Sequence, residues 1–238
     1  MKAVDNSAAV LAIASMTARR FLRSRILLIA LVFAALPLLP FLLGASADSS
    51  EPNRWRDFVG LTSAMQLLVA ALLAAPAIAE EIEDKTYAYL WSRPISRWTV
   101  LAGKLFTASL LGIALFAVTT VAGKAVTGFS DAAMVGKAIV GLGLGVITAS
   151  CMAAAFGTLM PKYPLAFSIS YFLVLDMGIG AMPFAGARIS VMHNVMAIAG
   201  HGEAESFFTS LGWLLGLAAF WTVIGLWRLT RNELSTGS

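Results

Sequence analysis

Hydrophobic residues occur in six long runs that shorter polar segments separate. A membrane-crossing α-helix needs about 20 mostly apolar residues, and each run is about that long. The runs predict transmembrane helices at 26–44, 58–79, 100–122, 138–160, 165–185 and 207–227. The connection at 186–206 is long and carries apolar residues at helical spacing. We expect one or two short helices there, which either gate the outer side or pack on the membrane surface.

Composition places the whole chain in the membrane class. Hydrophobic residues make up 59% of the 238 residues and charged residues 13%, and the mean hydropathy is +0.82. A soluble domain is about half apolar and a quarter charged. We therefore predict an all-α, polytopic membrane protein with one transmembrane domain over 1–238. The single cysteine, Cys151, excludes an internal disulfide and a cysteine-cluster metal site.

Basic residues set the expected orientation. With the N terminus in the cytoplasm, the inner side receives Lys2, Arg19, Arg20, Arg23, Arg25, Lys85, Arg93, Arg97, Lys104, Lys162, Arg228 and Arg231. The outer side then receives only Arg54, Arg56, Lys124, Lys137 and Arg188. Positive residues favour the cytoplasmic side, and six spans return the chain to the side where it began. Both termini are expected in the cytoplasm, and the net charge of +4 reflects topology rather than nucleic-acid binding.

An amphipathic helix is expected at 7–25, ahead of the first span. One side carries Val10, Leu11, Ala14, Thr17, Ala18, Phe21 and Leu22, and the other carries Arg19, Arg20, Arg23 and Arg25. Basic amphipathic helices bind membrane surfaces, and anionic lipid attracts each basic residue by about 1 kcal/mol. We expect these four arginines to contact membrane lipid, to fix the topology, or both.

The polar segment 80–97 between the second and third spans is dense in charge. Its acidic residues suit the first turns of a short helix, in which Glu81 and Lys85 form a favourable i,i+4 pair. Pro94 ends that helix, because the residue before a proline avoids the α conformation. The segment presents tyrosine, leucine, tryptophan and arginine, which are typical of protein interfaces. A protein-docking helix, a solvated turn and a helix on lipid headgroups all fit this pattern.

This segment resembles the loop between the second and third spans of ABC-2 type transporter permeases. The matching residues are Glu81, Thr86, Leu90, Ser92, Pro94, Arg97, Leu101 and Lys104. Lys85 departs from the pattern, because the family usually has glycine there. The family's six spans, cytoplasmic termini and amphipathic N-terminal helix agree with the elements expected here.

The resemblance implies that the segment is a coupling helix that docks on a separate ATP-hydrolysing subunit. The expected interface residues are Glu81, Asp84, Lys85, Thr86, Tyr89, Leu90, Arg93, Pro94 and Arg97. It also implies a dimer of permeases, identical or different, in the cell inner (plasma) membrane, with export favoured. ATP and Mg²⁺ would bind the partner ATPase, and this chain is expected to bind no cofactor. The alternative role is a membrane component that couples an ATPase to a membrane or periplasmic partner without transporting.

Two enzymatic functions are disfavoured. A Walker A loop needs a glycine five residues before its Gly-Lys pair and Ser or Thr after it. None of the pairs that end at Lys104, Lys124 and Lys137 meets either condition. An intramembrane protease would need histidines beside its glutamates, but His193 and His201 lie on the side expected to be opposite Glu81. Their spacing is also weak evidence for a metal site.

A few polar residues within the spans are candidates for a substrate path. Asp176 is the only acidic residue expected inside a span, where burial of charge is costly. Because spans two and five line the central pathway in related exporters, we predict that Thr62, Gln66 and Asp176 contact substrate. The structural alternative has Asp176 protonated, or hydrogen-bonded to a neighbour such as Thr107, Thr119 or Ser150.

Small residues and prolines predict details of packing. The pairs Gly141/Gly145 and Gly212/Gly216 have a spacing that permits close helix approach, and we favour packing within the chain over dimerisation. Pro37 and Pro40 in the first span, and Pro76 in the second, predict kinks or local unwinding.

Overall fold

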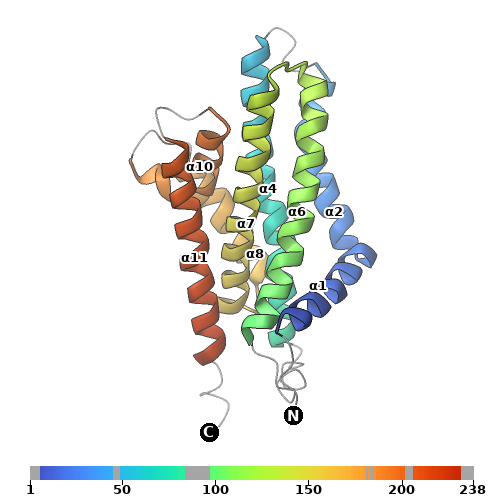
Figure 1. Ribbon diagram of the computed structural model, residues 1–238, viewed down its shortest axis with the longest axis vertical. Helices are drawn as coiled ribbons and strands as arrows, with labels where there is room; N and C mark the ends of the chain where they lie inside the picture. The colour runs from blue at the N-terminus through green and yellow to red at the C-terminus, as the bar shows by residue number, and fades with distance from the viewer. Residues whose placement is uncertain are drawn as a thin grey trace.

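The protein was analysed as a computed structural model, which describes residues 6–44, 49–83, 97–180, 182, 185–201 and 206–231. All the regular structure in these ranges is helical (Figure 1). The elements are α1 (Asn6–Arg23), α2 (Arg25–Ala35), η1 (Leu36–Leu38), α3 (Leu39–Leu42), α4 (Glu51–Glu83), α6 (Arg97–Thr127), α7 (Ala132–Leu159), α8 (Pro164–Ser170), η2 (Tyr171–Asp176), α9 (Met177–Gly180), η3 (Ala185–Ile189), α10 (Val191–Ile198) and α11 (Phe207–Arg231).

Five stretches in the described ranges are long and apolar enough to cross a membrane: Arg25–Leu42, Glu51–Ala77, Trp98–Thr127, Ala132–Leu159 and Phe207–Leu229. They match five of the six predicted spans and mostly extend beyond the predicted bounds. The fifth predicted span, 165–185, is instead the shorter apolar helix Pro164–Gly180. A π-helical turn over Tyr171–Asp176 interrupts this helix. At 1.5 Å per residue, the whole segment Pro164–Gly180 is about 26 Å long.

The prolines act differently in the first two membrane helices. Pro37 lies in the 3₁₀ turn η1, and Pro40 lies in the first turn of the short helix α3, so the α-helix of the first span is interrupted near its prolines as predicted. Of the kink or local unwinding predicted at Pro76, unwinding does not occur, because Pro76 lies within the continuous helix α4. A missing N–H costs a helix one hydrogen bond, which the packing around α4 offsets.

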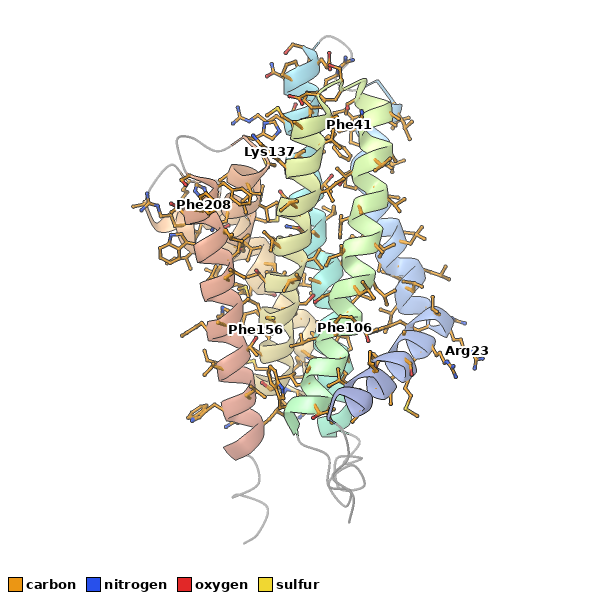
Figure 2. All side chains as sticks on the ribbon, in the orientation of Figure 1. Arg23, Phe41, Phe106, Lys137, Phe156 and Phe208 are labelled. Carbon is orange, nitrogen blue, oxygen red and sulfur yellow. The ribbon has the colours of Figure 1, made fainter. Side chains whose placement is uncertain are left out.

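Helix α4 forms the centre of the bundle. It packs against α2, α6, α7, α8 and α10, and most of its apolar segment is buried within the chain. The largest hydrophobic cluster joins Leu67 and Leu73 of α4 to Phe116, Phe156 and Phe172 on the surrounding helices. Figure 2 shows Phe156 within the bundle, between α7 and α11. Because α4 occupies the centre, α2 and α11 lie at the periphery, and most of their apolar residues are exposed.

Helix α1 lies obliquely across the end of the bundle where α4 ends and α6 begins (Figure 1). Its Ala14, Thr17 and Phe21 are buried, and the Thr107 hydroxyl of α6 donates to the Ala14 carbonyl at 3.1 Å. A Cβ atom at Gly103 would lie 3.0 Å from Ile13, so the glycine permits this close approach. Much of the apolar side of α1 therefore faces protein.

The two predicted glycine pairs have different surroundings. On α7, a Cβ at Gly141 would lie 3.0 Å from the Val195 carbonyl, so this pair packs within the chain as predicted. On α11, nothing lies within 4 Å of a Cβ at Gly212 or Gly216. The prediction of packing within the chain is therefore wrong for the α11 pair.

An aromatic cluster joins the ends of α4, α6 and α7 opposite α1. The Trp55 ring stacks on Phe129 at 4.7 Å and on Phe58 at 5.5 Å. The Glu51 carboxylate accepts hydrogen bonds from the backbone N–H and the hydroxyl of Ser130, at 2.6 and 2.9 Å. These contacts fix the turn between α6 and α7 on the first turns of α4.

Candidate functional site

The connection before the last span folds into two short helices, η3 and α10, as the sequence predicts. Helix α10 packs against α7, α11 and α4. Its Val191, Val195 and Ile198 are buried. The Asn194 amide donates to the carbonyls of Arg188 and Ser190, at 2.7 and 2.8 Å. The apolar face of α10 is thus inserted into the bundle rather than laid on its surface.

Asp176 holds the N-terminal end of α10. Its Oδ1 accepts from the Val191 N–H at 2.7 Å, and its Oδ2 accepts from the Met192 N–H at 3.1 Å and the Ser190 hydroxyl at 3.2 Å. Ser190 is itself the N-cap residue of α10. A carboxylate at a helix N-terminus accepts hydrogen bonds from N–H groups that would otherwise be unpaired. Its negative charge also interacts favourably with the positive end of the helix dipole.

The π-helical turn gives Asp176 its position. Asp176 ends that turn and is only 3% exposed. A Cβ at Gly180 would lie 2.4 Å from the Ser190 hydroxyl, so the chain after the turn passes close to α10. π-Helical turns are rare and frequently occur at functional sites. The partners of Asp176 are the residues at the start of α10 rather than Thr107, Thr119 or Ser150.

Gln66 lies where α4, α7 and α10 meet. Its side chain is fully buried, and neither its Oε1 nor its Nε2 has a hydrogen-bond partner among the described residues. A Cβ at Gly145 would lie 2.5 Å from both Gln66 Nε2 and Val195 Cγ2, so glycine leaves the space the amide occupies. An unpaired buried polar group costs about 1–3 kcal/mol. Gln66 is the one side chain among the described residues with two buried polar atoms that both lack a partner.

Thr62, one turn before Gln66, is also fully buried but its hydroxyl is satisfied. It donates to the Phe58 carbonyl of its own helix at 2.7 Å. In this conformation, Thr62 and Gln66 lie inside the chain and α10 packs beside Gln66. The structure thus brings Gln66 and Asp176 to the same short helix, Gln66 beside Val195 and Asp176 at its first turn.

The predicted ATPase-contacting residues Asp84, Lys85, Thr86, Tyr89, Leu90, Arg93 and Pro94 lie outside the described residues. Glu81 and Arg97 belong to α4 and α6, but their side chains are not described. The ends of α4 and α6 that border this segment lie at the same end of the bundle as α1 (Figure 1).

The four arginines of the N-terminal segment lie at this end too. Arg19, Arg20, Arg23 and Arg25 are exposed, and Figure 2 shows Arg23 pointing away from the bundle at the corner between α1 and α2. Ser24 makes that corner, because its hydroxyl accepts from the Ile26 N–H at 2.9 Å and caps α2. The predicted helix over 7–25 thus corresponds to α1, which ends at Arg23, while Arg25 begins α2.

A family model described as ABC-2 family transporter protein matches residues 20–178, more than half of the chain. The chain belongs to the ABC-2 transporter family. No curated protein matches its sequence significantly. Together with the long apolar helices, this membership makes the chain a multi-pass membrane protein and a transmembrane component rather than a catalytic subunit. The family implies association with an ABC ATPase in general.

Two features of this ABC-2 protein were not predicted from its sequence. One is the bond between Asp176 and the start of α10, since no spacing rule relates residues in a broken helix to a later loop helix. The other is the burial of Lys104, which the sequence places on α6 among the family's matching residues. Its amine donates to the Ala77 carbonyl of α4. A basic residue between apolar neighbours was the available signal.

Proposed function

We propose that this chain is the permease subunit of an ABC transporter that exports a substrate across the cell inner membrane. The observation that carries the proposal is the family match over 20–178, which includes the whole charged segment at 84–96. ATP and Mg²⁺ are held by a separate ATPase, and this chain binds no cofactor. Two permease chains, identical or different, form the pathway above two ATPase subunits.

Six crossings complete the proposed topology, with both termini in the cytoplasm. The fifth crossing is the broken helix from α8 to α9. At about 26 Å it is shorter than a hydrocarbon core of about 30 Å, and small mismatches of this kind are accommodated by local thinning. Helix α10 follows the end of this fifth crossing and precedes α11. In the six-crossing topology α10 therefore lies near the outer side, and α11 begins there.

The segment 84–96 is proposed to contact the ATPase. Support comes from the positions of its flanking helices, since α4 and α6 both reach the end of the bundle from which the segment leaves (Figure 1). The proposed interface is the predicted set, Glu81, Asp84, Lys85, Thr86, Tyr89, Leu90, Arg93, Pro94 and Arg97. Closure of the ATPase pair would move this segment and, through α4, the centre of the bundle.

Affinity purification from the native membrane in mild detergent tests the ATPase contact. Mass spectrometry should find a stoichiometric P-loop ATPase with the unmodified chain. Leu90→Asp should remove it, whereas Leu234→Asp, the same change near the C terminus, should keep it. Retention of the ATPase by Leu90→Asp would contradict the coupling role, and absence of any ATPase would contradict the function. Stimulation of ATP hydrolysis in liposomes by an exported compound separates transport from mechanical coupling to a partner.

Thr62, Gln66 and Asp176 are proposed to border the substrate path when α10 moves away from α4. The unpaired amide of Gln66 supports this, because water or substrate would supply the hydrogen bonds that it lacks in the closed arrangement. Asp176 would keep α10 in the closed arrangement through its bonds to Val191 and Met192. An opening movement would break the hydrogen bonds between Asp176 and α10, and it would allow Gln66 to form hydrogen bonds with water or substrate.

Thiol accessibility tests this path without knowledge of the cargo. In a Cys151→Ser background, Gln66→Cys should react with a small methanethiosulfonate reagent when the ATPase hydrolyses ATP, and much more slowly without ATP. Leu73→Cys provides the control, because Leu73 is equally buried on α4 within the main hydrophobic cluster. Equal, slow reaction of both cysteines in both states would refute the proposed path.

A further inference from the structure

Helix α10 is a short, separately capped unit between the broken helix and α11. Its eight residues begin after the Ser190 cap and end before Gly200, whose φ of +86° is accessible to glycine at little cost. The His201 N–H donates to the Met196 carbonyl at 2.9 Å and closes this end of the helix. Isolated helices of this length are marginally stable in water. The position of α10 therefore depends on its contacts with the bundle.

Two glycines of α7 receive the apolar side of α10. A Cβ at Gly141 would lie 3.0 Å from the Val195 carbonyl oxygen and 3.1 Å from Ile198 Cγ2. A Cβ at Gly145 would lie 2.5 Å from Val195 Cγ2. Residues four apart lie on the same face of a helix, so the two glycines form a groove that α10 fills.

The Gln66 amide reaches this groove from α4. The same Cβ at Gly145 would lie 2.5 Å from Gln66 Nε2, so the amide and the Val195 side chain meet at one notch. A glutamine amide offers two donors and a carbonyl acceptor, and neither polar atom has a partner among the described residues. Val195 belongs to the main hydrophobic cluster and brings only apolar atoms to this notch. Packing of α10 thus covers the amide without pairing it.

The polar neighbours of Gln66 on α4 are paired independently of α10. The Thr62 hydroxyl donates to the Phe58 carbonyl at 2.7 Å. The Ser63 hydroxyl donates to the Gly60 carbonyl, also at 2.7 Å. Both bonds lie within α4, so a movement of α10 leaves them intact. Such a movement would change the pairing of Gln66 alone among these three side chains.

Asp176 and Gln66 therefore act on α10 in opposite directions. Three hydrogen bonds to Asp176 fasten its first turn, whereas burial of the unpaired amide disfavours its packing by a factor on the order of ten. We propose that α10 is a lid whose packed and open arrangements are kept close in free energy by the Gln66 amide. The use of this balance in transport rests on the proposed path, but the balance itself is a property of this chain.

Hydrogen exchange of the purified full-length chain in nanodiscs tests the balance without ATPase or cargo. Gln66→Met keeps the length of the side chain and removes both unpaired atoms, so the backbone amides of α10 should exchange about tenfold more slowly. Thr62→Val is the matched control, because it removes a hydroxyl of α4 that is already paired, and it should not slow exchange in α10. Gln66→Leu is the second apolar variant and decides the test if Gln66→Met does not fold.

The outcomes separate this proposal from the proposed function. Unchanged or faster exchange of α10 in the apolar variants of Gln66 would overturn the lid balance, because the amide would then be paired in solution or act only on substrate. Equal slowing by Thr62→Val would overturn it too, since loss of any polar group on α4 would then suffice. Neither result concerns the ATPase contact, and absence of an ATPase partner would leave the expected slowing of exchange unchanged.

Discussion

Most hydroxyl groups within the long helices satisfy themselves locally. Thr62, Thr120 and Thr127 donate to carbonyls four residues earlier in their own helices, at 2.7, 2.6 and 2.8 Å. Such bonds are available wherever a threonine lies in a helix, so they carry little information about function. Asp176 differs because its carboxylate accepts three hydrogen bonds at the start of α10. Gln66 differs because neither polar atom of its side chain has a partner among the described residues.

The bonds of Asp176 to α10 predict a measurable loss of stability on substitution. Asp176→Asn replaces an acceptor oxygen by an amide that cannot accept from Met192 or Ser190. The free energy of unfolding in detergent should fall by about 1–3 kcal/mol, and amide hydrogen exchange in α10 should accelerate. Asp57→Asn is the matched control at an exposed position on α4 and should change neither quantity. Equal behaviour of the two variants would exclude a clamp at α10.

His201, which follows α10, predicts a dependence of stability on pH. Burial, and then the positive charge of Arg56, lower the pKa of His201 below its ordinary value of 6.5. The unfolded chain therefore binds a proton more readily, so stability is complete above pH 6.5 and declines as the pH falls through the lowered pKa. The melting temperature should drop from pH 7.5 to pH 5.5, and His201→Gln should reduce that drop. Parallel pH profiles for the two proteins would contradict this.

Single elements were predictable to different degrees, for physical reasons. Length and hydropathy identified the five long helices, because the bilayer demands both. The amphipathic patterns of α1 and α10 were recognised too. Hydrophobicity alone, however, does not say whether an apolar face meets lipid or protein, so the burial of Val195 and Phe21 needed the structure. The π-helical turn that ends at Asp176 has no sequence signal of its own. The sequence also did not show that the fifth apolar helix ends at Gly180.

The contact of α6 with α4 at Gly123 predicts a strong steric effect. A Cβ at Gly123 would lie 2.0 Å from Phe58 Cζ, and stacking on Trp55 restricts the Phe58 ring. Gly123→Ala should therefore lower the free energy of unfolding by about 1–3 kcal/mol, as overpacking does. Phe58→Leu in the same chain should recover part of the loss, because it removes the clashing ring atoms. Thermal unfolding of the two single variants and the double variant measures the coupling.

Gly136 of α7 is the control for that prediction. Nothing lies within 4 Å of a Cβ placed there. Alanine is favoured over glycine in a helix by about 1 kcal/mol, so Gly136→Ala should raise stability slightly. A loss of stability at both positions would mean that the steric contact with Phe58 is not the cause.

The whole molecule is asymmetric along its long axis. Helices α4 and α6 contain 33 and 31 residues and measure about 50 and 46 Å, well over a hydrocarbon core of about 30 Å. Both helices therefore extend beyond the membrane. The aromatic cluster of Trp55, Phe58 and Phe129 closes one end, while α1 lies across the other (Figure 1).

This asymmetry makes the proposed six-crossing topology testable with three single cysteines in a Cys151→Ser background. Ala133 and Lys162 are exposed at opposite ends of α7, and Ile189 is exposed beyond the broken helix. With a cytoplasmic N terminus, a membrane-impermeant maleimide should label Ala133→Cys and Ile189→Cys in intact cells, and Lys162→Cys only after permeabilisation. If the segment from α8 to α9 turned back without crossing, Ile189→Cys would be labelled together with Lys162→Cys instead. If only Lys162→Cys were labelled in intact cells, the whole orientation would be inverted, and the segment 84–96 would lie on the side of the membrane without ATP.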